Sequence, residues 1–135
     1  MRKSNITANF KSDIDSVWNI VTDNENYAWR SDLSKVEIID SNKFIEYTKE
    51  GYQTQFHITA KETNKRYEFD MANKNFSGHW VGIFTELECG GTKIDFTEEL
   101  KINNSVMEIL SYLFMNLKKI QEQYIIDLRK ALKES

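Results

Sequence analysis

The sequence predicts an α+β domain in which a curved antiparallel sheet wraps around a long C-terminal helix. Three observations lead to this prediction. Apolar and polar residues alternate with period two near the N-terminus, strand-like segments separated by short turns fill the middle, and helical periodicity runs to the C-terminal end. A run of strands followed by a helix indicates an α+β arrangement, because a parallel α/β sheet would alternate the two.

The N-terminal segment predicts one strand followed by short helices. Residues 5–10 alternate between apolar and polar side chains, as a half-buried strand does. A capping box at Ser12 then precedes a helix. The apolar stripe of that helix is Ile14, Val17, Trp18 and Val21. After the turn-forming residues 22–26, the segment 27–33 is predicted to be a second short helix, which carries Trp29.

The middle of the chain predicts an antiparallel meander. The predicted strands cover residues 35–40, 43–49, 52–62, 66–73, 77–89 and 92–102. The breaks between them are a few turn-forming residues long, as hairpins between antiparallel neighbours require. The strongest turn signal is the pair Gly90 and Gly91, because glycine tolerates the positive φ angles of tight hairpins.

The C-terminal segment predicts one long amphipathic helix. Its main apolar positions are Val106, Leu110, Leu113, Leu117, Ile120, Tyr124 and Leu128. A helix of about 28 residues is about 40 Å long, which exceeds the diameter of a small domain. The helix therefore has to lie across the sheet, its only available partner.

Composition indicates one domain spanning residues 1–135. The 40% of hydrophobic residues can form a substantial core without a disulfide, and Cys89 is the only cysteine and reads as an inert loop thiol. The net charge of −3, with no basic block, argues against nucleic-acid binding. No apolar run resembles a secretory signal or spans a bilayer, so we expect a cytoplasmic protein without stable membrane insertion.

Two sequence segments carry a resemblance to a known family. The order of elements, the letters VWNIVTD at 17–23, Trp29, and the letters FTELECGGTK at 84–93 resemble the polyketide cyclase and lipid-transport branch of the START-like (SRPBCC) superfamily. That superfamily has the helix-grip, or Bet v 1-like, fold. The resemblance implies a deep apolar cavity between the sheet and the last helix and no fixed catalytic residues. The chain departs from the family pattern in having no prolines near Trp29.

Strand and helix phase predicts which side chains line such a cavity. The expected ligand-binding residues are Tyr27, Trp29, Phe56, Ile58, Tyr67, Phe69, His79, Val81, Ile83, Phe96, Met107, Leu110 and Phe114. Both faces of the strand 77–89 are apolar. We expect Val81 and Ile83 to point inward, which would leave Trp80 and Phe84 exposed as a self-association surface for a possible homodimer.

A few polar residues are candidates for chemistry in the cavity. Glu98 is in phase with Phe96, so it is expected either to point inward as a polar anchor or base with a raised pKa, or to reach water near the strand end. His79 either faces the cavity or lies at the surface, whereas His57 is expected to face solvent. Arg30 either pairs with an acidic group of a ligand or is solvated.

The sequence supports three hypotheses about function. There is no phosphate-binding loop and no zinc motif, so no cofactor or metal is expected, and no catalytic residue is assigned. The first hypothesis is a small soluble carrier or sensor of an apolar or aromatic small molecule. The alternatives are a cyclase- or dehydratase-type enzyme, in which His79, Glu98 or a tyrosine moves protons, and a protein-interaction module that acts through the exposed Trp80 and Phe84 face.

Overall fold

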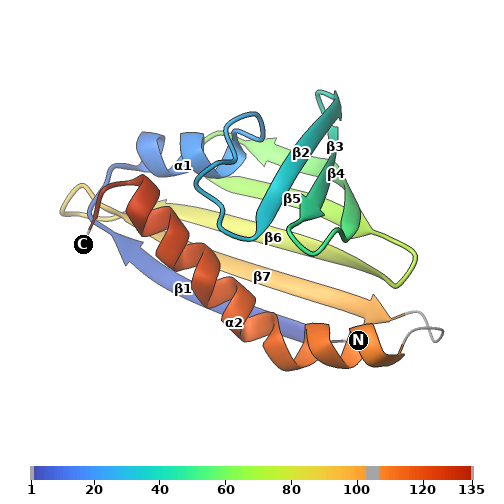
Figure 1. Ribbon diagram of the computed structural model, residues 1–135. Helices are drawn as coiled ribbons and strands as arrows, with labels where there is room; N and C mark the ends of the chain where they lie inside the picture. Colours follow the sequence, from blue (N-terminus) through green and yellow to red (C-terminus); the bar gives the residue numbers. More distant parts are fainter. Residues whose placement is uncertain (1, 103–106, 135) are drawn as a thin grey trace.

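The computed structural model describes residues 2–102 and 107–134, without the side chains of residues 107–116. The chain begins with β1 (Arg2–Phe10) and α1 (Ile14–Thr22) and ends in α2 (Met107–Ala131) (Figure 1). Between them lie β2 (Leu33–Asp40), β3 (Lys43–Thr48), β4 (Gln53–Glu62), β5 (Arg66–Ala72), β6 (Phe76–Glu86) and β7 (Thr92–Ile102).

The strands of the described residues form one antiparallel sheet in the order β1-β7-β6-β5-β4-β3-β2. Strands β2 to β7 are a meander of sequential hairpins, and β1 pairs with β7 along its whole length. Helix α2 crosses one face of the curved sheet on the β1 side, and α1 covers the end of the same face (Figure 1). The predicted α+β fold with a helix gripped by a curved sheet is confirmed.

The segment before β2 differs from the prediction. Residues 27–32 form turns, not a second helix, and β2 already begins at Leu33. The backbone N–H of Ser31 donates a hydrogen bond of 2.9 Å to the carboxylate of Asp127 on α2. The N–H of Ser31 is therefore bound by a side chain that is distant in sequence. In a helix it would instead be bound by the carbonyl of the residue four positions earlier.

Helix α1 buries the predicted face, with Val17, Trp18 and Val21 in the core. The Ser12 capping box is not formed. Asp13 is the N-cap residue, and the hydroxyl and backbone N–H of Ser12 donate to the carboxylate of Glu134 at 2.6 and 2.9 Å. Glu134 thereby fixes the C-terminal end of the chain to the β1–α1 loop.

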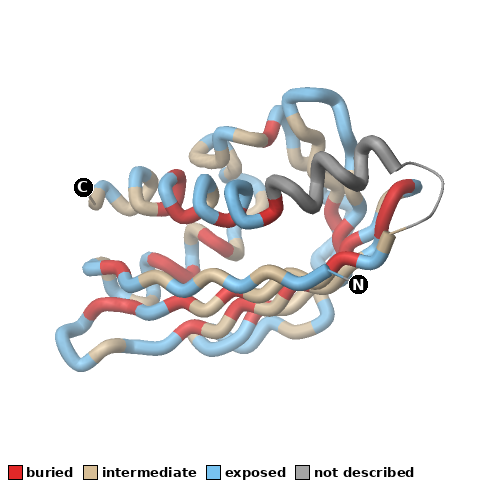
Figure 2. The backbone as a smooth tube through the Cα atoms, turned by 90° about the horizontal axis from the view of Figure 1, so that it is seen from below, coloured by how far each residue is buried: buried red, intermediate tan, exposed pale blue. Residues whose placement is uncertain are grey.

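The core lies between the concave face of the sheet and the two helices. Figure 2 shows that the buried positions of α2 lie on its side facing the sheet. On β6 the buried side chains include Trp80 and Phe84, while Val81 and Ile83 are half-buried on the opposite face. The prediction that Val81 and Ile83 point into the core is wrong, and so is the prediction of an exposed Trp80 and Phe84 surface.

The register between β6 and β7 explains this reversal. Phe84 pairs with Ile94, and Trp80 pairs with Glu98. Residues directly opposite each other in an antiparallel pair lie on the same face of the sheet. Because Ile94 points inward, Phe84 does too, and Trp80, four residues before Phe84 on the same strand, shares that face. Trp80 and Phe84 are core residues, so they do not form the exposed surface on which the interaction-module hypothesis and the possible homodimer were based.

Candidate functional site

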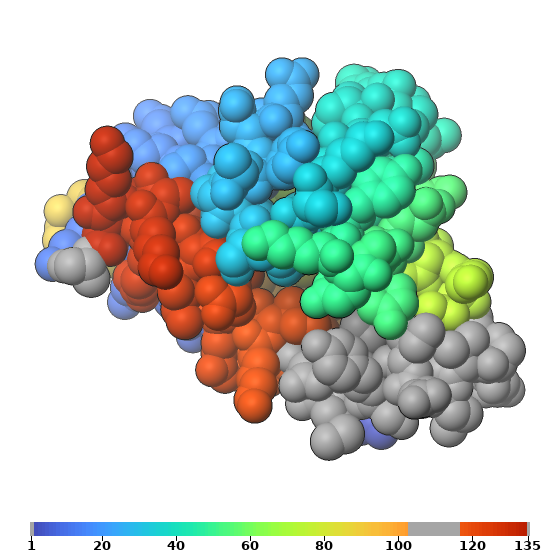
Figure 3. Space-filling model, viewed as in Figure 1, coloured from blue at the N-terminus to red at the C-terminus, as the bar shows by residue number. Residues whose placement is uncertain are grey.

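A cavity of about 210 Å³ lies between the inner face of the sheet and the two helices. It shares wall residues with a second hollow of about 410 Å³, which lies between the β3–β4 turn, the β5–β6 turn and α2. We name these the inner cavity and the mouth. In Figure 3 the segment around residue 30 and the β3–β4 turn lie next to α2, at the entrance to these spaces.

Eight aromatic residues contribute to the wall of the inner cavity. They are Phe44, Phe56, Tyr67, Phe69, Phe76, Trp80, Phe96 and Tyr124. The rings support one another, since Trp80 stacks on Phe69 with a centroid distance of 4.8 Å and contacts Phe96 at 4.6 Å. Such ring contacts add stability beyond the burial of area, so the wall holds its shape around the space.

Four of the predicted cavity residues meet in this wall: Phe56, Tyr67, Phe69 and Phe96. Trp29 and Ile58 pack against the edge of the core without lining the inner cavity, and Tyr27 is half-buried outside it. The predicted Met107, Leu110 and Phe114 fall among the side chains outside the described part of the chain.

The wall also contains residues that the sequence reading missed. Trp80 is the largest of them, and its indole lies over Gly82, where a Cβ atom would approach the ring to 2.5 Å. Tyr124 was identified as part of the helical stripe but not as a wall residue. Helical periodicity was enough to predict that Tyr124 lies on the buried face of its helix. The inward direction of Trp80 follows only from the register between β6 and β7.

Glu98 projects into the inner cavity from β7, opposite Trp80. Among the described residues its carboxylate has no hydrogen-bond or ion-pair partner. Burial raises the pKa of Glu98 to about 7, the charge of Glu46 raises it further, and Arg30 opposes the change. Of the two alternatives that the sequence left open for Glu98, the structure supports the inward carboxylate with a raised pKa.

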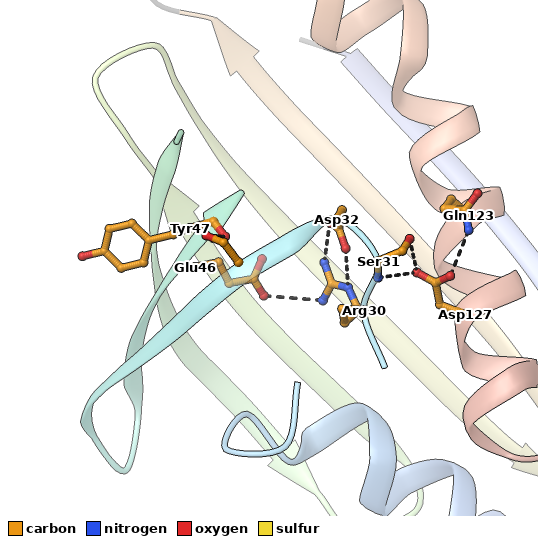
Figure 4. A network of polar contacts seen from close by, with 8 residues as sticks. Arg30, Ser31, Asp32, Glu46, Tyr47, Gln123 and Asp127 are labelled. Atoms are coloured by element: carbon orange, nitrogen blue, oxygen red, sulfur yellow. Dashed lines mark hydrogen bonds and ion pairs between the residues drawn. The ribbon is translucent and has the colours of Figure 1, made fainter. Parts of the chain in front are cut away.

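Arg30 forms a charged network where the inner cavity meets the mouth (Figure 4). Its Nε and Nη2 donate to the two oxygens of Asp32 at 3.0 and 2.9 Å, and Nη1 lies 3.6 Å from Glu46. The guanidinium lies over the ring of Tyr124 at 4.8 Å. Arg30 is thus neither solvated nor free for an acidic ligand group, because two carboxylates already compensate its charge.

A second set of hydrogen bonds holds this network against α2 (Figure 4). Asp127 accepts hydrogen bonds from the N–H and hydroxyl of Ser31 and from the side-chain amide of Gln123. Burial opposes ionisation of Asp127, but these donors outweigh it and hold the pKa below its usual range. The turn that carries Arg30 is therefore fixed to the helix on the other side of the cavity.

His79 lies on the outer face of the sheet, away from Glu98. Its Nδ1 is 2.6 Å from Asp70 and its Nε2 is 2.8 Å from Glu68. The prediction that His79 lines the cavity is wrong, because it shares the face of Val81. His79 and Glu98 do not converge, so the proton-transfer pair considered for an enzyme is not formed.

The outer cluster leads to a prediction about pH. Partial burial lowers the pKa of His79, but hydrogen bonds to Glu68 and Asp70 outweigh it and raise the pKa above 6.5. Protonated His79 therefore stabilises the fold fully below about pH 6.5, and this contribution is lost as pH rises through the higher folded-state pKa. Because the side chain of His79 is 36% exposed, we expect a contribution of less than about 1 kcal/mol.

Urea unfolding of the wild type and of His79→Gln at pH 5.5 and pH 8.5 measures this contribution. The wild type should lose more unfolding free energy between the two pH values than the variant does. Equal losses in both proteins would contradict the assignment of His79 as a stabilising cation.

Within residues 2–102 and 107–134, no cluster of histidine, cysteine and carboxylate side chains is arranged to hold a metal ion. Over the same part of the chain, no helix combines the length and apolar character needed to cross a membrane.

Comparisons with known proteins identify the fold. No protein-family model matches the sequence, and no curated protein matches it significantly. Solved structures do match. A conserved protein from Geobacillus kaustophilus aligns over 98% of this chain and 95% of its own, with a TM-score of 0.83 and 14% identity. A START superfamily protein from Mycobacterium smegmatis aligns over 96% and 93%, with a TM-score of 0.70 and 15% identity.

A third match is BexL, a di-domain ARO/CYC protein of the BE-7585A biosynthetic pathway. It aligns over 98% of this chain and 47% of its own, with a TM-score of 0.79 and 10% identity. The chain therefore corresponds in extent to about half of this two-domain protein. At these identities the likeness establishes the fold, which is the START-like helix-grip fold that the sequence predicted.

Proposed function

We propose that the protein is a carrier or sensor that binds an apolar or aromatic small molecule in the inner cavity. The observation that carries this proposal is the space of about 210 Å³ that the aromatic wall leaves between sheet and helix. Protein interiors are normally packed as densely as organic crystals, with few voids larger than a water molecule. A ring-lined space of this size is suited to an occupant.

The size of the space limits the ligand. A cavity of about 150 Å³ is enough for benzene, and typical ligand sites occupy about 300 to 1,000 Å³. The inner cavity suits a body of one or two rings, and the mouth of about 410 Å³ leaves room for a further group. Burial of ligand surface, at roughly 25 cal/mol per Å², supplies the affinity before the costs of association.

The structural comparisons support the same role. The matched START superfamily protein and the ARO/CYC protein BexL share the helix-grip fold, in which the family resemblance implies a cavity between the sheet and the last helix. The cyclase alternative is less well supported, because His79 lies on the outer face and leaves Glu98 without that partner.

The wall residue Ile120 offers a test. It is 39% exposed, and it lines both the inner cavity and the mouth. Ile120→Trp should narrow the passage between the mouth and the inner cavity. The neutral fluorescent probe N-phenyl-1-naphthylamine should then bind about tenfold or more weakly, because the larger side chain keeps the probe from most of its apolar contacts. The measurement is the rise in probe emission during titration.

Ile126→Trp is the matched control, because Ile126 lies on the same helix, is 47% exposed and lines neither space. It should bind the probe as the wild type does. Wild-type protein that shows no saturable binding, or an Ile120→Trp variant that binds as well as the control, would contradict the proposed function.

A further inference from the structure

We infer that the inner cavity selects an amphipathic amine, whose cationic nitrogen binds the carboxylate of Glu98 while its apolar body lies among the aromatic rings. This inference rests on the proposed ligand-binding function and specifies its ligand class. It follows from three features of the cavity wall: a carboxylate without a partner among the described residues, an excess of negative charge, and aromatic residues on the same face as that carboxylate.

The first feature is the state of Glu98. Its carboxylate lines the cavity and has no partner among the described residues, and because Glu98 is half-buried its charge is only partly hydrated. Burial raises its pKa to about 7, so the free protein holds it partly protonated near neutral pH. A ligand that brings a positive charge would supply the missing partner.

The second feature is the charge balance of the wall. The other titratable or charged groups that face the inner cavity in the described residues are Arg30 and Asp32 of the turn before β2, Glu46 of β3, Tyr67 of β5 and Tyr124 of α2. The described wall residues of β1, β4, β6 and α1 carry no titratable group.

Arg30 is already compensated by Asp32 and Glu46. When Glu98 ionises, the wall therefore carries three carboxylates against one guanidinium. A cationic ligand reduces this imbalance, whereas a carboxylate ligand would add a fourth negative charge. The wall is thus unsuited to an acidic ligand, even though it contains an arginine.

The third feature is the set of rings around Glu98. Trp80 lies directly across the β6–β7 pair from Glu98 on the same face. Phe96 contacts Trp80 at 4.6 Å and Tyr124 at 5.9 Å between ring centroids. Aromatic faces attract cations through the ring quadrupole, most strongly where water is excluded. Carboxylate and rings together form a site for an ammonium group on an apolar body.

Three probes that share a phenylethyl body test the inference. They are 2-phenylethylamine, which is cationic, 2-phenylethanol, which is neutral, and 3-phenylpropionate, which is anionic. Titrations of wild-type protein at pH 8, followed by NMR, should show the amine binding about tenfold or more tightly than the alcohol, and the propionate binding most weakly.

Two substitutions on β7 locate the preference. Glu98→Gln should bring the amine-to-alcohol affinity ratio close to one, because the amide keeps the shape and loses the charge. Glu99→Gln is the control, since Glu99 lies on the outer face and pairs with Lys3 at 3.5 Å. That variant should keep the wild-type ratio.

A pH series on the wild type gives a measurement that needs no variant. The amine affinity should rise about tenfold between pH 6 and pH 8, since Glu98 has to lose its proton before it pairs. Calorimetry in two buffers of different ionisation enthalpy should detect proton release on amine binding at pH 6.5 and none for the alcohol. Glu99→Gln should keep this pH dependence, and Glu98→Gln should abolish it.

Equal binding of amine and alcohol to the wild type would overturn the inference and leave the proposed function standing. So would a preference for the amine, or a pH dependence of its binding, that persists in Glu98→Gln. If none of the three probes binds the wild type, the inference and the proposed function fail together.

Discussion

Glu98→Gln is expected to raise the free energy of unfolding at pH 8 by up to about 3 kcal/mol. In the unfolded chain the carboxyl has its ordinary pKa of 4.5, and in the folded protein burial raises that value to about 7. The folded protein therefore holds its proton more tightly than the unfolded chain. The stability that this proton contributes is fully present below pH 4.5 and is lost as pH rises to about 7.

Urea unfolding of both proteins at pH 5 and pH 8 measures the effect. The wild type should lose unfolding free energy between these pH values, and Glu98→Gln should lose much less. Glu99→Gln should behave as the wild type, because Glu99 faces outward. A Glu98→Gln variant that is no more stable than the wild type at pH 8 would show that Glu98 is solvated or paired in the folded protein.

Arg30→Met is expected to lower the free energy of unfolding by about 3 kcal/mol, at the low end of the cost of breaking a buried ion pair. Arg30 and Glu46 have side chains only 17% and 16% exposed, so the substitution leaves Glu46 without a compensating charge. Asp32 is 41% exposed and can be hydrated, which limits the loss. Methionine keeps much of the apolar volume of the arginine side chain.

A double-mutant cycle identifies the cause of the loss. Adding Glu46→Gln to Arg30→Met should recover about half of the lost stability, because it removes the uncompensated buried charge of Glu46. Arg66→Met is the control. Arg66 pairs with Glu68 on the outer face and is 44% exposed, so its loss should be below about 1 kcal/mol. Equal losses for Arg30→Met and Arg66→Met would contradict a buried network at the mouth.

Local sequence patterns predicted most of the fold. The period-two strands, their short turns and the C-terminal helix depend on neighbouring residues, and a meander joins each strand to the next, so the sheet order follows from the hairpins. Strand phase offered the inward direction of Glu98 as one of two alternatives, because it links Glu98 to Phe96 two residues earlier.

The sequence pattern of β6 could not predict which of its faces is buried, because both faces are apolar. The length of the connection between β6 and β7 determines the buried face. The strand ends at Glu86, and residues 87–91 form the connection. A two-residue turn at Gly90 and Gly91 would instead have paired odd-numbered residues of β6 with even-numbered residues of β7. That single change of parity places Val81 and Ile83 inside the core, which is the error made from sequence.

The turn at 27–32 and the charged network also lay beyond the reach of sequence patterns. The Ser31 N–H is bound by Asp127, 96 residues away. Arg30 meets Glu46 only because β3 lies beside β2 in the sheet. Contacts of this kind depend on the assembled fold, and no local periodicity encodes them.

The central claim is that a small molecule enters the space between the sheet and α2. The most direct test is a methyl NMR titration of the wild-type protein with 2-phenylethanol. The claim predicts shifts at the methyl groups of Ile6 and Leu100, which line the inner cavity, and none at Val81 and Ile83 on the outer face. Shifts confined to Val81 and Ile83, or no saturable shift at any of the four residues, would contradict it.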